Sequence, residues 1–366
     1  MSLTSRRNLL IGLVALAWLP LLLLSLIAGR ALAPGVALPF LEDFEIHARL
    51  LLGVPLLLVA ERRVHARLNR ITELFLERDL VREEDRERYQ GLVASSMKLR
   101  ESLVAKLLLL ALVYGVTVPF VWRQAVALDV TSWYAMPGAE GATRLTAAGW
   151  WAACVSQPLF QFLLLQWYFR LLLWARFLFK VSRLELRLVP THPDGTAGLE
   201  FLTLVVRAYS LVMMAQGAVL AGMMANRIFH AGATLAEFKL ELVGIVALMV
   251  LAVLGPLLFF HPQLRRARRI GLEDLGALGQ AYGRDFDRRW QHGQVPADRE
   301  LLGAADIQSL ADLRNSYLVV ADMRRIPFSM KSIMTLVYLT LLPVAPLLLT
   351  MFSAEELVER VLKSIF

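Results

Sequence analysis

Several ionisable side chains stand directly before an apolar run near the start of the chain. They fall in the stretch EDFEIHARLLLGVPLLLVA, residues 42–60, and are Glu42, Asp43, Glu45, His47 and Arg49. In a helix, Glu45 and Arg49 are four positions apart, which is the spacing of a helical ion pair. Charged groups at membrane depth must face water or a partner, because contact with lipid is costly. The stretch therefore predicts that Glu45, His47 and Arg49 line the outer mouth of an aqueous path.

The same charges also fit a helix that begins outside the membrane and leaves them among lipid headgroups. The uncharged part, residues 50–60, spans about 16 Å of helix at a rise of about 1.5 Å per residue. That is too short for a hydrocarbon core about 30 Å thick. Either the charged half enters the membrane, or Val64 and Leu68 complete the apolar length on the inner side. The sequence leaves both alternatives open.

Basic residues also lie inside apolar runs that contain no acidic residue. Lys106 and Arg176 lie near the inner ends of their runs and can extend to the membrane surface, whereas Arg170 and Arg207 lie deeper. Arg170 and Arg207 are therefore predicted to meet an anion, a lipid phosphate or a group of carbonyl oxygens, and basic groups in a pore favour anions. Extension to inner-leaflet phosphates explains them equally well.

A loop of turn-forming residues, RLVPTHPDGTAGLEF, covers residues 187–201. His192, Asp194, Gly195 and Gly198 are its candidate functional residues, and they could hold a phosphate or a cation. Pro-Asp-Gly is also a strong turn signal, so a purely structural turn is the favoured interpretation. One histidine and one aspartate do not make a metal site, and the sequence predicts neither a metal nor a cofactor.

This loop is joined by two further stretches, MRRIPF at 323–328 and LLPVAPLLLTMFSAEELVERVLK at 341–363. Together they resemble a group of uncharacterised bacterial inner-membrane proteins that share an HPDxxxGL motif in a cytoplasmic loop. The resemblance covers the loop and the last apolar run. It implies a bacterial inner-membrane setting and no particular activity.

The composition of the whole chain is that of a membrane protein. The 366 residues are 57% hydrophobic and 19% charged, whereas soluble proteins are about 45–50% apolar and about 25% charged. The net charge of +8 is explained by basic residues that collect beside spans on the cytoplasmic side, so no nucleic acid is expected as a partner. The single cysteine, Cys154, cannot form an internal disulfide.

The apolar runs predict an all-α polytopic protein with about seven transmembrane helices. The expected spans are 8–29, 42–60, 103–122, 148–178, 201–226, 240–260 and 330–352. The first is longer than the core of a signal peptide and is taken as a retained span. Lys and Arg outside the spans fall mainly in 61–102 and 263–329, which predicts a cytoplasmic N-terminus and an outer C-terminus.

The polar segments between the spans are also expected to be helical. The chain divides into the first two spans (1–60), a charged cytoplasmic helix (61–102), spans three to six (103–262), a cytoplasmic helical segment (263–329), the last span (330–352) and an interfacial amphipathic helix (353–366). The two cytoplasmic segments are expected to form a helical layer. No alternating pattern predicts a strand, and Gly217 and Gly222 predict close contacts between helices.

These features favour a channel-like permeation protein that leans toward anions and assembles from several copies. Glu45, His47 and Arg49 would line its mouth, and Arg170 and Arg207 would meet the ion deeper in the path. The expected partners are membrane lipid, a small ion or solute and further copies of the chain. The alternatives are a proton-coupled secondary transporter and a non-transporting scaffold or sensor. Motifs for nucleophilic, nucleotide-dependent or metalloprotease chemistry are absent, so no enzyme is expected.

Overall fold

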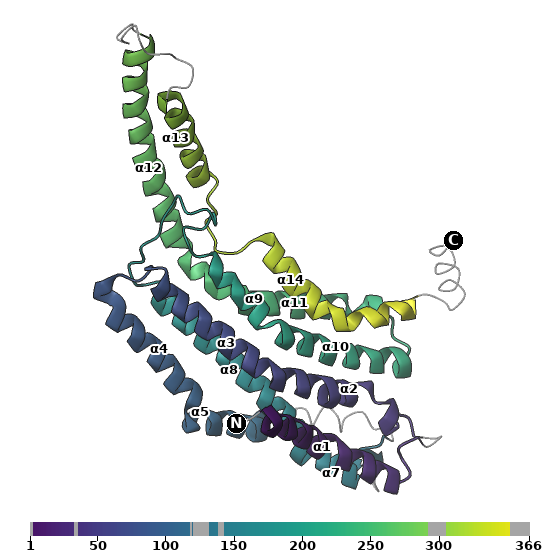
Figure 1. Cartoon of the computed structure of the whole chain (residues 1–366). Helices are drawn as coiled ribbons and strands as arrows, with labels where there is room; N and C mark the ends of the chain where they lie inside the picture. The colour runs from purple at the N-terminus through teal and green to yellow at the C-terminus, as the bar shows by residue number, and fades with distance from the viewer. Residues whose placement is uncertain are drawn as a thin grey trace.

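A computed structural model of the chain is almost entirely helical (Figure 1). It describes residues 3–32, 36–117, 119, 132–137, 143–291 and 305–351. The predicted all-α class is therefore confirmed. The predicted interfacial helix 353–366 lies outside the described residues.

The first half of the fold is built on one long helix that contains the charged stretch near the N-terminus. The elements in chain order are α1 (Leu3–Ile27), a 3-10 turn (Phe40–Glu42), α2 (Phe44–His47), a π-helical segment (Ala48–Gly53), α3 (Val54–Glu77), a 3-10 turn (Glu83–Asp85), α4 (Arg86–Glu101), α5 (Leu103–Leu112) and a π-helical segment (Val113–Thr117). Asp43 begins α2 as a helix cap, because its carboxylate accepts the backbone N–H of Ile46 at 3.0 Å. From α2 to α3 the helix is continuous.

The second half consists of helices that cross or leave the same bundle. They are α7 (Ala147–Trp151), a π-helical segment (Ala152–Ser156), α8 (Gln157–Val181), a 3-10 turn (Glu200–Thr203), α9 (Leu204–Ala208), α10 (Ser210–Ala231), a 3-10 turn (Leu235–Phe238), α11 (Lys239–Leu254), a 3-10 segment (Gly255–Phe260), α12 (His261–Phe286), a π-helical segment (Asp287–Gln291), α13 (Ala305–Ala321), α14 (Met330–Leu341) and a 3-10 segment (Leu342–Met351).

Prolines explain two of the π-helical segments. One segment, Ala48–Gly53, ends shortly before Pro55, and another, Ala152–Ser156, ends shortly before Pro158. Proline has no N–H to donate to the carbonyl four residues earlier, and its ring pushes that carbonyl away. A widened turn before the proline accommodates this loss without breaking the helix.

A small hairpin corrects the expectation of no strands. Strand β1 (Ala135–Pro137) pairs antiparallel with β2 (Thr143–Leu145), and Met136 stands opposite Arg144. Strands of this length do not contain enough residues to show the alternation by which a strand is recognised in a sequence.

Five described helices are long and apolar enough to cross a membrane, which makes the chain a helical membrane protein. They are Arg7–Ile27, Ala147–Val181, Ser210–Ala231, Leu235–Trp290 and Met330–Met351. Two of the seven predicted spans are not among them. The run at 42–60 is one part of a long helix that carries many charges, and the apolar helix in the next run, Leu103–Val116, is shorter than the others.

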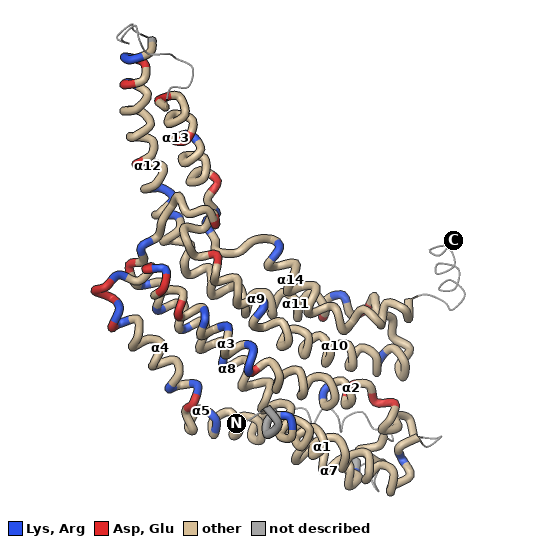
Figure 2. Tube along the Cα trace, in the orientation of Figure 1, with Lys and Arg blue, Asp and Glu red and all other residues tan. Residues whose placement is uncertain are grey.

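Charge separates the parts of the molecule that fit a membrane from those that do not. Figure 2 shows few charged residues along α10, α11 and α14, and many along α3, α4 and α12. Both predicted cytoplasmic segments are mainly helical over their described residues, 61–102, 263–291 and 305–329. Helix α4 packs along α8, while α13 packs on α12 to form a hairpin that projects from the body (Figure 1).

Close contacts around α10 hold the centre of the bundle together. A Cβ atom added at Gly222 would lie 2.5 Å from Cβ of Ala48, and one added at Gly217 would overlap the carbonyl oxygen of Thr340. Helix α10 therefore touches the start of the π-helical segment after α2 with one glycine and the end of α14 with the other. The close contacts predicted from Gly217 and Gly222 are confirmed.

Candidate functional site

A cavity of about 760 Å³ opens between α1, α3, α4 and α8. Its volume falls within the range of about 300–1,000 Å³ that is usual for small-molecule sites. Most of its wall is apolar, with Leu10 from α1, Leu58 from α3, Met97 from α4 and Leu173 from α8. The cavity is therefore suited to a ligand with a hydrocarbon part.

Helical periodicity explains why these side chains face the same space. Lining residues recur three or four positions apart on each of three helices, which places them on one face: Leu58, Glu61, His65, Leu68 and Thr72 on α3, Val93, Ser96 and Arg100 on α4, and Arg170, Leu173 and Phe177 on α8. The packing of α4 on α8 and of α3 on α8 brings these faces together.

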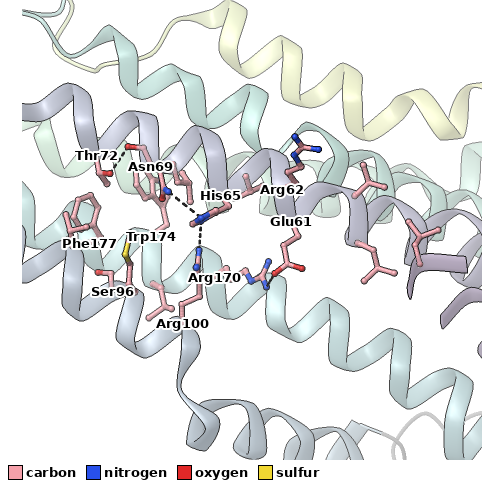
Figure 3. A pocket seen from close by; sticks show the side chains of 18 of the residues that line it. Glu61, Arg62, His65, Asn69, Thr72, Ser96, Arg100, Arg170, Trp174 and Phe177 are labelled. Atoms are coloured by element: carbon pink, nitrogen blue, oxygen red, sulfur yellow. Dashed lines mark hydrogen bonds and ion pairs between the residues drawn. The ribbon is translucent and has the colours of Figure 1, made fainter. Parts of the chain in front are cut away.

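Polar side chains from three helices meet in one part of this cavity (Figure 3). The guanidinium of Arg170 lies 2.7 Å from a carboxylate oxygen of Glu61 and stacks over the ring of Trp167 at 4.8 Å. The Nη1 atom of Arg100 lies 2.8 Å from Nδ1 of His65. Since a guanidinium can only donate hydrogen bonds, Nδ1 of His65 is the acceptor of this bond.

The surroundings of His65 disfavour its protonated form. His65 lies on α3 beyond the predicted span 42–60. Burial lowers the pKa of His65, and the positive charge of Arg100 lowers it further, while the carboxylate of Glu61 acts in the opposite direction. His65 is therefore neutral at neutral pH and acts as the hydrogen-bond acceptor of Arg100.

The charges that line the cavity do not balance. Arg7, Arg62, Arg100 and Arg170 contribute positive charge, and Glu61 is the carboxylate among the lining residues. A second cavity of about 20 Å³, with room for about one water molecule, lies against Arg100 and Arg170 and is also lined by Lys106 and Gln166. An anion in the larger cavity would meet several cations supplied by different helices.

Trp174 is a further large side chain in the wall of the same cavity. Its side chain is only 4% exposed and lines the cavity wall. Within the described residues, its indole nitrogen has no hydrogen-bond partner. A buried donor without a partner is costly, but this nitrogen is closed off from the cavity, so Trp174 contributes apolar ring surface to the wall.

The residues predicted to line an outer mouth are engaged with one another and with neighbouring helices. Arg49 pairs with Glu45, as predicted, and donates to the side chain of Gln157 at 3.2 Å. His47 accepts the indole N–H of Trp18 at 2.9 Å. None of the predicted mouth residues lines the cavity described above.

The two deep arginines have different surroundings. Arg170 lines the cavity, whereas Arg207 is exposed on α9 and does not line it. Arg170 pairs with Glu61 of α3, which lies one residue beyond the apolar run 42–60. The sequence does not indicate this ion pair, because Glu61 lies in a different helix from Arg170 and just beyond an apolar run.

Sequence reasoning also missed most of the cavity's polar residues. Arg62, His65 and Arg100 lie in the predicted cytoplasmic helix 61–102, and Arg7 precedes the first predicted span. Their helical spacing among apolar residues was a signal, but it did not reveal which helices pack together.

The loop with the HPD motif has the geometry of a tight structural turn. The carboxylate of Asp194 accepts the backbone N–H groups of Thr196 at 2.8 Å, Gly198 at 3.1 Å and Glu200 at 3.1 Å. Burial opposes ionisation of Asp194, but these three donors outweigh it and hold the pKa of Asp194 below its usual value. The carboxylate is therefore already satisfied by its own loop.

The other candidate residues of this loop shape the turn. Gly195 and Gly198 adopt positive φ angles of 65° and 96°, which glycine allows without strain. His192 accepts the backbone N–H of Asp194 at 3.2 Å. Arg324 fastens the loop to the chain after α13, since its guanidinium donates to the carbonyl oxygen of Asp194 at 3.0 Å. In the part of the chain that the structure describes, no three His, Cys, Asp or Glu side chains gather as a metal ion requires.

No family model matches this chain, and no curated protein or solved structure is detectably similar to it. The case for a function therefore comes from the geometry and charge of the cavity alone.

Proposed function

We propose that this protein binds an anionic amphiphile, such as an acidic lipid, in the cavity between α1, α3, α4 and α8. One observation carries the proposal: an apolar cavity is lined by four arginines and one glutamate. The apolar wall suits a hydrocarbon chain. Arginine suits a carboxylate or phosphate, because its planar fork can donate two parallel hydrogen bonds.

The position of the cavity along the helices supports this proposal. Arg7 begins the first apolar span, Arg7–Ile27, and Arg62 follows the uncharged run 50–60. With the N-terminus inside, both arginines stand at the level of the inner headgroups, where basic residues attract acidic lipids. Leu10 lies about one turn further along α1 from Arg7, toward the hydrocarbon core. A bound lipid would keep its usual orientation, with its head at the arginines and its chain among the leucines.

The bilayer assignment belongs to the same proposal. We place the protein in a bacterial inner membrane with a cytoplasmic N-terminus, on the strength of the Lys and Arg distribution. The ligand would then come from the cytoplasmic leaflet.

Energy transfer from tryptophan to a pyrene-labelled lipid tests the proposal, since Trp174 lines the cavity and Trp167 contacts Arg170. The purified protein should bind labelled phosphatidylglycerol at least tenfold more tightly than phosphatidylcholine with the same chains. The double variant Arg100→Gln/Arg170→Gln should lose this preference.

The matched control is Arg207→Gln/Arg314→Gln, which removes the same charge from exposed positions outside the cavity. It should keep the preference for the anionic lipid. Equal binding of both lipids by the unaltered protein, or an equal loss in the two double variants, would refute the cavity as the binding site.

A channel-like protein that favours anions is the second candidate. It is favoured by the half-buried group of Glu45, Arg49 and Gln157, in which the Nε atom of Arg49 is buried and has no partner among the described residues. Several copies could arrange such groups around a common path. The candidate predicts unitary currents in a planar bilayer whose reversal potential follows the chloride gradient and shifts in Arg49→Gln. Absence of currents would exclude it.

A further inference from the structure

We infer that the amphiphile carries a phosphomonoester head group, which takes the place of Glu61 beside Arg170 and is held between Arg100 and Arg170. This inference rests on the proposed function and specifies the class of ligand. It follows from the balance of charge in the cavity, from the exposure of Glu61 and from the positions of the two arginines.

The charge balance can accommodate more than one negative charge. Glu61 offsets one of the four lining arginines. Arg100 is hydrogen-bonded to neutral His65 and lies 3.3 Å from the exposed carboxylate of Glu101. Arg7 and Arg62 have no ion-pair partner within the described residues. A carboxylate or phosphodiester brings one negative charge, whereas a phosphomonoester brings about 1.5–2 at pH 7 and three acceptor oxygens.

The two members of the Glu61–Arg170 ion pair differ in their exposure to solvent. The side chain of Glu61 is 57% exposed, while that of Arg170 is 21% exposed and stacks on Trp167. Exposed ion pairs contribute little to stability, so Glu61 can turn into water at small cost. Arg170 stays in place because the ring of Trp167 holds its guanidinium. The carboxylate therefore occupies a position that a ligand anion can take over.

Arg100 on α4 and Arg170 on α8 line the same cavities, so both can bind one anion. Each lines both the large cavity and the small one beside it, so their side chains form part of the wall between the two. Lys106 also lines the small cavity and adds a third positive charge there. Figure 3 shows Arg100 and Arg170 approaching the same part of the cavity from α4 and α8. Three terminal oxygens can serve both guanidinium groups at once, whereas a carboxylate has two.

The apolar wall decides between a lipid and a soluble phosphate. A soluble phosphomonoester would leave Leu58, Met97 and Leu173 without a partner, whereas an acyl chain would cover them. Both parts of the cavity are thus used by one molecule.

Competition against the pyrene-labelled phosphatidylglycerol tests the inference on the purified full-length protein. Dioctanoyl phosphatidic acid should displace the label at a concentration at least tenfold lower than dioctanoyl phosphatidylglycerol or octanoate. Glycerol 3-phosphate, which has the head group without the chains, should not displace it at the same concentrations.

The outcomes separate this inference from the proposed function. Equal potency of phosphatidic acid and phosphatidylglycerol would overturn the phosphomonoester but leave an anion-binding cavity. Displacement by glycerol 3-phosphate at the potency of phosphatidic acid would show a soluble phosphate site and overturn the lipid. Failure of every anionic lipid to compete better than phosphatidylcholine would refute the proposed function itself.

A charge-matched pair of variants tests the place of Glu61. Glu61→Gln removes the competing carboxylate and should tighten phosphatidic acid binding by about three- to tenfold. Glu73→Gln removes the same charge from an exposed position on the same helix, outside the cavity, and should change binding less than twofold. Weaker binding by Glu61→Gln than by Glu73→Gln would overturn the exchange at Arg170.

Discussion

At the scale of single residues, the contact between His65 and Arg100 should make ligand affinity in the cavity depend on pH. Protonation of His65 would remove the acceptor of Arg100 and place two positive groups side by side. The other charged groups around His65 are Arg7 on α1, Glu61 and Arg62 on α3, Glu101 on α4 and Arg170 on α8. Burial and the positive charges of Arg100 and Arg170 keep the pKa of His65 below its usual value. A bound anion would offset the nearby arginines and raise it.

Ligand affinity should consequently gain a contribution from His65 as the pH falls. The gain begins at the raised pKa of the bound state and is complete below the lowered pKa of the free state. His65→Gln removes this contribution, so the difference between the unaltered protein and the variant isolates it from the titration of the ligand. The measurement is lipid affinity from pH 5 to pH 8 for both proteins. Parallel pH profiles would contradict a role of His65 at the bound head group.

At the scale of elements, the HPD loop and the contacts of α10 stabilise the fold. In the loop, Asp194 satisfies three backbone N–H groups and is fastened by Arg324 to the chain after α13. This loop therefore joins the C-terminal end of α8 to the base of the α12–α13 hairpin. Its conspicuous residues are explained by the conformation they stabilise.

Asp194→Ala should destabilise the protein by about 2–4 kcal/mol, because it leaves three backbone donors without a charged acceptor. The carboxylate has a lowered pKa in the folded protein, so its contribution is present above the unfolded value of about 3.9 and is lost as the pH falls through the folded value. Unfolding in detergent should show a difference from the unaltered protein that is largest at pH 7 and shrinks as the pH falls below about 4. A difference independent of pH would contradict this account.

Close packing at α10 makes a second prediction at this scale. Gly217→Ala should destabilise the protein by about 1–3 kcal/mol, since the added methyl group meets the carbonyl oxygen of Thr340. Gly244→Ala on α11 is the control, because a Cβ atom there meets nothing within 4 Å. That control should be neutral or stabilising by up to about 1 kcal/mol. Equal melting temperatures for the two variants would mean that α10 and α14 do not touch at Gly217.

The sequence predicted the local features of the fold well and the site poorly. Helical class, the Glu45–Arg49 pair and the close contacts of Gly217 and Gly222 all follow from spacing within one segment. The cavity depends instead on which helices lie side by side, and Glu61 and Arg170 are 109 residues apart. Periodicity shows which face of a helix is buried, but it does not show which other helix packs against that face.

At the scale of the whole molecule, the account depends on the orientation of the helices in the membrane. Arg7, Arg62, Arg100 and Arg170 can meet acidic headgroups only if the N-terminal end of α1 faces the cytoplasmic leaflet, where basic segments collect. The same orientation places the α12–α13 hairpin in the cytoplasm and the turn before α11 outside.

Labelling of single cysteines in intact cells should reveal this orientation. In a Cys154→Ser background, Lys239→Cys should react with a membrane-impermeant maleimide, because it lies at the start of α11 on the outer side. Ser309→Cys on α13 should react only after the cells are permeabilised. Both positions are exposed, so accessibility within the fold does not decide the result. The reverse pattern would contradict the proposed topology.

The most direct test of the central claim is mass spectrometry of the protein released from its native membrane in mild detergent. The unaltered protein should retain an acidic lipid, and its fragmentation should give a phosphomonoester head group. The variant Arg100→Gln/Arg170→Gln should lose that lipid, while Arg207→Gln/Arg314→Gln should keep it. If the unaltered protein carries no acidic lipid, or if both double variants retain the same one, the cavity between α1, α3, α4 and α8 is not an anionic lipid site.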